Sequence, residues 1–192
     1  MRVDDSPGPA IGRSVHALRS ARGLSMRALA SSAGVSQPFL SKLENGLLQP
    51  SIATLYALAT ALDVAPGELL PPAFAAAPAG ARVTSGSPLL LHSGEEAGTP
   101  TAQLLSGGPG SKLEVYLFTA EPGSSDAAPF EHAGEEFVHV LTGTVVAHRD
   151  GHPALSLAAG DSLTLDPGVP HWWGAPESND GPATFLLVST RA

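Results

Sequence analysis

The sequence contains no cysteine among its 192 residues. This absence excludes disulfide bonds, zinc–thiolate sites and catalytic thiols, and it is compatible with a reducing compartment. Long apolar runs are also lacking, because no stretch approaches the roughly 20 apolar residues that a membrane-spanning helix needs. Residues 1–7 do not include the apolar segment of a secretory signal. We therefore expect a soluble, cytoplasmic protein with no membrane partner.

Charged residues are few, at 15% of the chain, and their signs are unevenly distributed. The formal net charge is −8, but residues 1–70 carry +1 and the rest of the chain carries −9. Such asymmetry indicates two domains with different partners. The acidity of the whole chain therefore does not exclude nucleic-acid binding by the first 70 residues.

The spacing of apolar residues changes along the chain. Within residues 1–70 they recur at helical spacing, whereas residues 71–83 are rich in proline and alanine and predict a linker. From residue 84 to 192, short alternating runs such as 136–141 are separated by glycine and proline. The sequence thus predicts an α + β protein of two domains, one helical and one an all-β barrel or sandwich.

Two short helices joined by a tight turn are predicted near the N-terminus. Ser25 and Ser36 are suited to cap the first turns of these helices, since a hydroxyl accepts from a free backbone N–H. Gly34 and Gly46 follow the helices, where glycine adopts the left-handed conformation at no steric cost. Pro38 is compatible with the first turn of the second helix, whose N–H groups are free anyway.

Each of these helices has one apolar and one outward face. The residues expected to face inward are Leu29, Ala30, Ala33, Leu40 and Leu43. The residues expected on the outer face of the second helix are Gln37, Pro38, Ser41 and Lys42. A plain helical bundle without a DNA role is the alternative, but such a bundle has no need of this bare, mostly polar face.

The segment from Ser25 to Leu62 resembles the Xre/Cro/C1-type helix-turn-helix regulators. Its matching residues include Leu29-Ala30, Gly34-Val35-Ser36, Leu40 to Gly46, Pro50-Ser51 and Leu58-Ala59. The resemblance implies a five-helix lambda-repressor-like bundle whose second short helix enters the major groove of double-stranded DNA.

Carried over by position, the resemblance implies base readout by Gln37 and Lys42 and a thymine-methyl contact by Pro38. It also implies phosphate contacts by Ser36, Ser41 and Asn45, and we expect Arg27 to meet phosphate. Met26 replaces the glutamine that is usual in the family, and this departure removes one typical phosphate contact.

Two blocks in the C-terminal half carry candidate metal ligands. Strand alternation places Glu136, Val138 and Val140 on one face and His139 on the other. His132 lies just before this run. If a later strand delivers His171 to the same interior, two imidazoles and one carboxylate converge, a ligand set suited to Fe(II) or another divalent ion.

The same blocks resemble the paired motifs of the cupin superfamily, whose fold is a double-stranded β-helix barrel. The matching residues are His132, Glu136, Gly143, Gly160, Gly168 and His171. Phe130 stands where the family's first histidine is usual, and Asp166 and Ala175 replace a proline and an asparagine. The resemblance implies one divalent metal (Fe, Mn, Zn or Ni) at His132, Glu136 and His171. A metal-free small-molecule pocket, or a purely structural dimerisation barrel, is the alternative.

The remaining histidines and the tryptophans are expected to have structural or solvated positions. Trp172 and Trp173 should lie on opposite faces of a strand, and core packing is the expected role for either. His148 and His152 should be solvated beside the Asp150-Gly151 turn. His92 lies in a segment without an assigned element.

Taken together, these patterns predict a sequence-specific DNA-binding transcriptional regulator rather than an enzyme. Its barrels would pair as a homodimer and present two recognition helices to a palindromic operator, with half-sites about 34 Å apart. A small-molecule effector in the barrel would change operator affinity.

The alternative is a mononuclear non-haem iron enzyme, because certain cupin epoxidases of phosphonate antibiotic synthesis also carry a helix-turn-helix domain. Their ligand pattern is similar to His132, Glu136 and His171. The intact outer face of the predicted recognition helix favours the regulator, as does the scarcity of basic residues after the linker.

Overall fold

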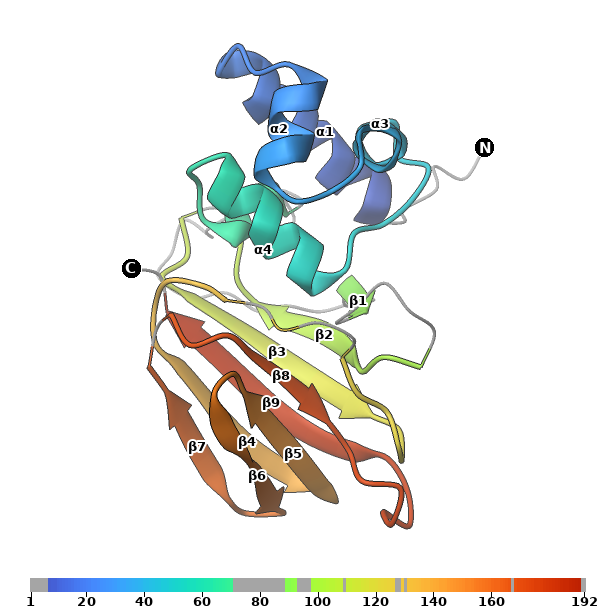
Figure 1. Cartoon of the computed structure of the whole chain (residues 1–192), viewed down its shortest axis with the longest axis vertical. Coiled ribbons are helices and arrows are strands. Elements are labelled where there is room, and N and C mark those ends of the chain that lie inside the picture. Colours follow the sequence, from blue (N-terminus) through green and yellow to red (C-terminus); the bar gives the residue numbers. More distant parts are fainter. Residues whose placement is uncertain are drawn as a thin grey trace, which may run out of the picture. The chain divides into compact units, whose positions relative to one another are not determined.

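The computed structural model describes residues 7–70, 89–92, 98–108, 110–126, 129, 131–166 and 168–190. They form two compact units, one helical and one made of β-strands (Figure 1). This confirms the α + β organisation that the sequence predicts. The predicted linker at 71–83 and the predicted start of the second domain at residue 84 lie outside the described residues, so the domain boundaries stay a prediction.

The helical unit contains four α-helices and one short 3-10 helix among the described residues. These elements are α1 (Pro7–Ala21), α2 (Met26–Ser32), α3 (Gln37–Glu44), α4 (Ile52–Ala61) and η1 (Pro66–Leu69). The expected fifth α-helix is therefore not confirmed, and η1 is a single turn in its place. Two prolines follow η1 at positions 71 and 72. Because proline disfavours the α conformation of the residue before it, η1 cannot readily continue as a longer helix.

The capping signals act as the sequence predicts. Ser25 Oγ accepts a hydrogen bond from the Ala28 N–H at 3.1 Å, and Ser36 Oγ accepts one from the Phe39 N–H at 3.2 Å. Gly34, which follows the C-cap of α2, has a φ of +67°. The predicted inward residues of α2 and α3 are all buried, namely Leu29, Ala30, Ala33, Leu40 and Leu43.

Helices α1 and α3 meet backbone to backbone at Gly12. A Cβ atom on this buried glycine would overlap the carbonyl oxygen of Leu43 and lie 3.3 Å from the Cα of Glu44. The back of α3 therefore rests directly on α1, and any larger residue at position 12 would push α3 away.

The β unit contains two antiparallel sheets, the arrangement expected of a barrel. The larger has the strand order β1-β2-β3-β9-β4-β7 and the smaller has the order β6-β5-β8. The strands are β1 (Leu89–His92), β2 (Thr101–Ser106), β3 (Leu113–Ala120), β4 (Glu136–Thr142), β5 (Thr144–Arg149), β6 (His152–Ala158), β7 (Ser162–Leu165), β8 (His171–Gly174) and β9 (Ala183–Thr190). None of the helices in the described parts of the chain has the length and apolarity needed to cross a bilayer.

An aromatic core fills the interior of the β unit. Phe118 stacks on Phe185 with ring centroids 4.9 Å apart, and Trp173 lies 5.4 Å from Phe185. Tyr116 and Phe118 face inward on β3, together with Glu114, while Leu113 at the start of that strand is exposed. Alternation along β3 predicts two faces, but only the structure shows which of them is buried.

Candidate nucleic-acid interface and metal centre

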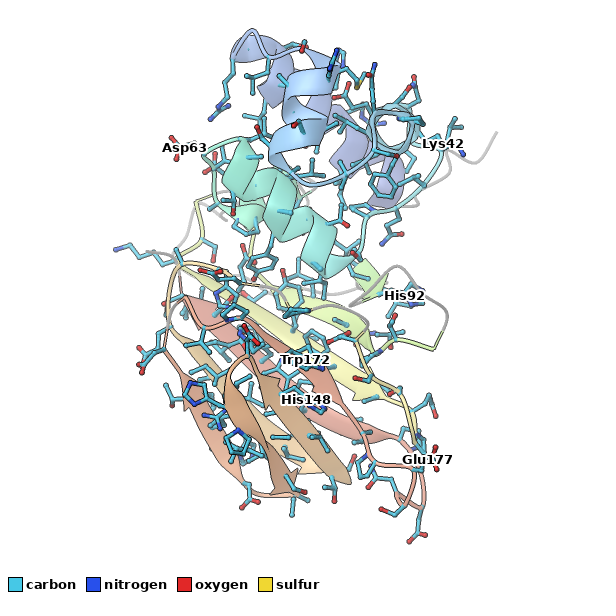
Figure 2. All side chains as sticks on the ribbon, in the orientation of Figure 1. Lys42, Asp63, His92, His148, Trp172 and Glu177 are labelled. Atoms are coloured by element: carbon cyan, nitrogen blue, oxygen red, sulfur yellow. The ribbon has the colours of Figure 1, made fainter. Side chains whose placement is uncertain are left out.

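The residues predicted to contact DNA share one side of α3. Gln37, Pro38 and Lys42 are exposed and Ser41 is half-buried, and Lys42 projects from this helix in Figure 2. The four positions lie on one side of the helix because residues three and four apart are neighbours, which links Gln37 to Ser41 and Pro38 to both Ser41 and Lys42. The structure thus brings these side chains together, while their individual DNA contacts stay a prediction.

Two predicted phosphate-contacting residues also have roles inside the protein. Ser36 accepts a hydrogen bond as the N-cap of α3, yet a hydroxyl has one further acceptor site and its own O–H to donate. Exposed Asn45 donates from Nδ2 to the Ser41 carbonyl at 2.7 Å. Arg27, on α2, is exposed.

A largely buried ion pair holds the back of α3 on α1, and no local sequence pattern indicates it. Arg19 donates through Nε to Glu44 Oε1 at 2.6 Å and through Nη2 to Glu44 Oε2 at 2.7 Å. Arg19 also donates to the Leu24 carbonyl at 3.0 Å, and His16 Nδ1 lies 2.8 Å from Glu44 Oε2. The partners are 25 residues apart, so no short-range spacing signals this bidentate pair.

Electrostatics in this pair favour the charged forms. Burial by itself raises the pKa of Glu44, but hydrogen bonds from Arg19 and His16, with their positive charge, outweigh it, and the pKa is lowered overall. The hydrogen bond to Glu44 likewise raises the pKa of Arg19. Glu44 therefore holds α3 as a carboxylate.

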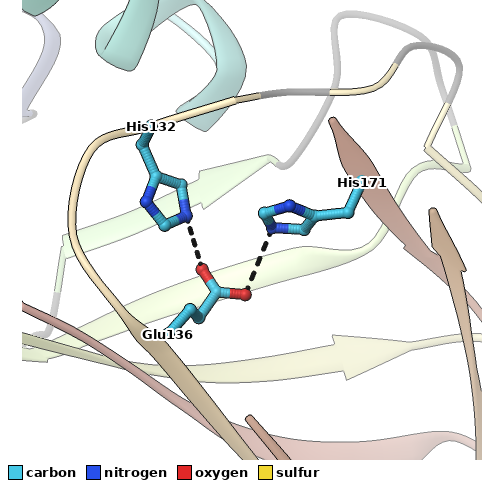
Figure 3. Close-up of side chains that lie close together, drawn as sticks. All are labelled: His132, Glu136 and His171. Atoms are coloured by element: carbon cyan, nitrogen blue, oxygen red, sulfur yellow. Dashed lines mark hydrogen bonds and ion pairs between the residues drawn. The ribbon is translucent and has the colours of Figure 1, made fainter. Parts of the chain in front are cut away.

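In the β unit, His132, Glu136 and His171 converge as the sequence predicts (Figure 3). His132 Nε2 lies 2.9 Å from Glu136 Oε2, and His171 Nε2 lies 3.3 Å from Glu136 Oε1. All three residues are buried, and one ligand atom from each lies within 4.8 Å of the others. The two imidazole rings are nearly perpendicular, at 83°.

Three separate elements position these side chains. Glu136 begins β4 and His171 begins β8. His132 belongs to the preceding loop, which is attached to the end of β9, because Thr190 N–H donates to the Glu135 carbonyl at 2.9 Å. Gly134 makes that attachment possible, since it has a φ of +99° and a Cβ there would overlap the Thr190 carbonyl oxygen.

The carboxylate of Glu136 and the imidazole of His171 stabilise each other's charged forms. Burial favours neutral Glu136, but hydrogen bonds from His132 and His171 outweigh this effect and the pKa of Glu136 is lowered. Burial also disfavours charged His171, yet the hydrogen bond and charge of Glu136 and the Val169 carbonyl raise its pKa overall. The cluster therefore offers one anionic carboxylate, from Glu136, and two ring nitrogens, from His132 and His171, as ligand groups.

The donor set fits a divalent metal. Two imidazole nitrogens and one carboxylate form a common ligand set for divalent metals, and here their ligand atoms lie within 4.8 Å of one another in a buried position. His171 Nδ1 lies 2.8 Å from the Val169 carbonyl oxygen and can donate to it, which leaves Nε2 directed at the cluster as a ligand atom. These three residues could therefore hold one divalent ion. Phe130, the departure from the cupin pattern, lies outside the described residues.

The other histidines and tryptophans mostly follow the predictions. His139 lies on the opposite side of β4 from Glu136, beside Ser162 Oγ at 2.9 Å, and Trp173 is buried while Trp172 is half-buried. His148 is not simply solvated, because its ring stacks on Trp172 with centroids 5.0 Å apart (Figure 2). Cross-strand pairing of β5 with β8 brings these two rings together.

Glu114 is buried in the barrel interior although it belongs to neither of the two cupin-like motifs. Tyr116 donates its hydroxyl hydrogen to Glu114 Oε2 at 2.9 Å, and both side chains are buried. Glu114 and Glu136 both pair with Ser189 of the strand between them, so they share one cross-strand row. Their common signal is strand alternation, which places Glu114 on the same face as Tyr116 and Phe118.

Two family models match the two units of this chain, and one known regulator matches across both of them. A helix-turn-helix family model matches residues 15–69, and a cupin-domain model matches residues 116–189. The HTH-type transcriptional regulator PuuR of Escherichia coli is 27% identical over 85% of this chain and 86% of its own length. The HTH-type transcriptional regulator y4dJ of Sinorhizobium fredii is 40% identical over 32% of this chain and 80% of its own length.

Solved structures agree on the fold. An HTH_3 family transcriptional regulator from Vibrio cholerae superposes with a TM-score of 0.69 at 23% identity, covering 96% of this chain and 97% of that one. Hydroxypropylphosphonic acid epoxidase from S. wedmorenis superposes less well, with a TM-score of 0.48 at 20% identity, over 96% of this chain and 98% of its own. Both curated relatives are named as transcriptional regulators, which supports a regulator over the iron enzyme.

Proposed function

This chain belongs to the helix-turn-helix transcriptional regulators, and on that premise we propose that α3 reads operator DNA while the cupin domain controls that reading. The observation that carries the proposal is the division of α3 into two faces. Its back is held on α1 by the Gly12 contact and the Arg19–Glu44 ion pair, while its outer face is exposed. A rigidly mounted helix with free polar side chains is what base readout requires.

The proposed contacts divide into readout and positioning. Gln37 and Lys42 would hydrogen-bond base edges in the major groove, and Pro38 would contact a thymine methyl group. Ser36, Ser41, Asn45 and Arg27 would hold phosphates and set the register of the helix without carrying sequence information. Two copies of the chain would bind a palindromic operator with half-sites about 34 Å apart.

The barrel would act as the sensor. His132, Glu136 and His171 would hold one divalent ion, and such an ion supplies ligand positions for oxygen or nitrogen atoms of a small effector. The effector changes operator affinity only if it binds more tightly to one arrangement of the protein than to another. The buried Glu114–Tyr116 pair adds further polar groups to the barrel interior.

The proposal is tested by selecting bound DNA from a random pool and by elemental analysis of protein purified without chelator. We expect a palindromic consensus, and Fe, Mn, Zn or Ni approaching one ion per chain. A random pool that yields no consensus contradicts operator reading by α3. Metal that stays at background in both wild type and Glu136→Ala contradicts the metal-dependent sensor and leaves a metal-free pocket.

A further inference from the structure

We infer that Arg149 binds the carboxylate group of a small acidic effector beside the cluster of His132, Glu136 and His171. The inference rests on the proposed sensor function of the barrel and names the chemical class of its ligand. Three features of Arg149 support it: its position opposite His171, the absence of an ion pair with any described residue, and a buried donor without an acceptor among those residues.

Arg149 faces the interior of the β unit at the end where the cluster lies. It is the last residue of β5, and the register of β5 with β8 places it directly opposite His171, the first residue of β8. Directly opposed residues of an antiparallel pair share one face, so Arg149 lies on the inward face with buried His171. Alternation along β5 agrees with this, because Val145 and Ala147 on the same face are buried.

Hydrogen bonds hold Arg149 and His171 in this register. The Asp150 N–H, next to Arg149, donates to the carbonyl of Pro170 at 2.8 Å. Arg149 itself donates through Nη2 to the Pro153 carbonyl at 3.0 Å, which restrains the guanidinium. Opposed Cα atoms of an antiparallel pair are about 5 Å apart. A molecule of only a few atoms can therefore contact both the guanidinium and the ligand groups of the cluster.

Arg149 has no carboxylate partner within the described part of an acidic region. Residues 71–192 contain thirteen acidic and four basic residues, so carboxylates greatly outnumber cations there. The Arg149 guanidinium nevertheless bonds to the backbone carbonyl of Pro153 rather than to an acid. The buried carboxylate of Asp126 instead accepts from the Trp173 N–H at 3.0 Å. The positive charge of Arg149 is therefore available to an anionic ligand.

The Nε atom of Arg149 is a buried donor without an acceptor among the described residues. A buried donor on a charged group destabilises a folded protein when it has no acceptor, and most such groups in native proteins are satisfied. Arg149 as a whole is only half-buried, so solvent and solutes reach the rest of its guanidinium. This combination points to a ligand that supplies the missing acceptor.

A carboxylate is the ligand chemistry that meets these conditions. Arginine presents a rigid planar fork of N–H donors, which binds a carboxylate through two parallel charge-assisted hydrogen bonds. Such a ligand supplies an acceptor for Nε of Arg149 and an anion for its charge. Its other oxygen atoms would lie toward the cluster, where a divalent ion accepts oxygen ligands. The expected effector is therefore a small acid with a second oxygen-bearing group, such as a dicarboxylate.

The test titrates the full-length protein with malonate, succinate and citrate, with their neutral amides malonamide and succinamide, and with inorganic phosphate. Tryptophan emission reports binding, because Trp172 and Trp173 follow His171 on β8. We expect at least one acid to bind wild type, and Arg149→Gln to bind it roughly tenfold more weakly. Lys112→Gln is the matched control, since it makes the same charge change at an exposed position and should bind like wild type.

Arg149→Lys, which keeps the charge but loses the planar fork, should bind the acid with intermediate affinity and serves if Arg149→Gln does not fold by circular dichroism. The inference is overturned if no acid binds wild type, or if both Arg149 variants bind the acids like wild type. Equal binding of the neutral amides, or tighter binding of phosphate than of every acid, also overturns it.

Two further measurements separate this result from the proposed function. The titrations are repeated with chelator and with added Mn²⁺, and Arg149-dependent binding of an acid in either condition supports the inference. Operator affinity is then measured with and without the acid that binds. If that acid binds through Arg149 but leaves operator affinity unchanged, the inference stands and the proposed sensor function fails.

Discussion

Glu44 and Glu136 are buried carboxylates whose charge is held by different kinds of neighbour. Glu44 accepts two hydrogen bonds from one guanidinium, which cannot lose its proton in the physiological range. Glu136 lies between two imidazoles, which can exchange protons for a metal ion. At the scale of single residues, the Arg19–Glu44 ion pair therefore stays charged and holds α3 on α1. Glu136, in contrast, belongs to a cluster that can bind either protons or a metal ion.

Replacing Arg19 with alanine should destabilise the helical unit. The change leaves the partly buried Glu44 carboxylate without its main partner, and the loss should be about 1–3 kcal/mol, between the values for exposed and for fully buried ion pairs. Chemical unfolding followed by far-ultraviolet circular dichroism would measure the loss. Arg22→Ala is the control, because Arg22 is exposed with one weak 3.4 Å contact to the Asp63 carbonyl, and it should change the free energy of unfolding by less than about 0.5 kcal/mol. Equal effects of the two changes would contradict this role of Arg19.

Acid should remove the difference between wild type and Arg19→Ala. Because the pKa of Glu44 is lowered in the folded protein, its contribution is complete above the ordinary value of 4.5 and is lost as pH falls through the folded value. The same unfolding measurements, repeated between pH 7 and pH 3, should therefore show the two stabilities converging below about pH 4.5. A gap that stays constant down to pH 3 would mean that Arg19 acts by packing alone.

At the scale of elements, α3 allows base readout to be separated from phosphate binding. Gln37→Ala and Lys42→Ala should each cost about 1–3 kcal/mol at the selected operator and relax preference at particular base pairs. Arg27→Ala on α2 should instead weaken all sequences alike and reduce the salt dependence of binding. Binding assays against operator variants at several salt concentrations would distinguish the two patterns. Wild-type affinity after the double change Gln37→Ala, Lys42→Ala would rule out the proposed readout.

The features that the sequence predicts best are the helix ends, because residues close in the chain determine them. Ser25, Ser36 and Gly34 determine where α2 and α3 begin and end, and each acts within one helical turn, so the sequence predicts them. The Arg19–Glu44 pair and the His148–Trp172 stack depend on packing between distant segments, which no local pattern encodes. For the metal cluster, alternation predicts the face of Glu136, but the placement of His171 beside it came from the cupin resemblance.

For the whole molecule, metal binding should stabilise the β unit and be visible in its fluorescence. Both tryptophans, Trp172 and Trp173, belong to β8, so tryptophan emission follows the unfolding of this unit alone. A divalent ion at 100 times its dissociation constant should add about 2.7 kcal/mol and raise the melting temperature. The increase should weaken below about pH 6, where protons compete for the imidazoles.

Two alanine variants control the thermal experiment. Glu136→Ala removes the anionic ligand and should abolish the metal-dependent increase, whereas Glu135→Ala changes an exposed neighbour and should preserve it. An equal increase in both variants would show that the added metal binds elsewhere.

The two faces of α3 also have a consequence for how such a regulator can diversify. The residues that hold the helix in place, Leu40, Leu43 and Glu44, are separate from the outward residues Gln37, Pro38 and Lys42. A lineage could therefore exchange the outward set, and with it the genes it controls, without re-evolving a fold. Because of the same separation, substitutions on the outward face of α3 could give an existing sensor domain a new operator specificity.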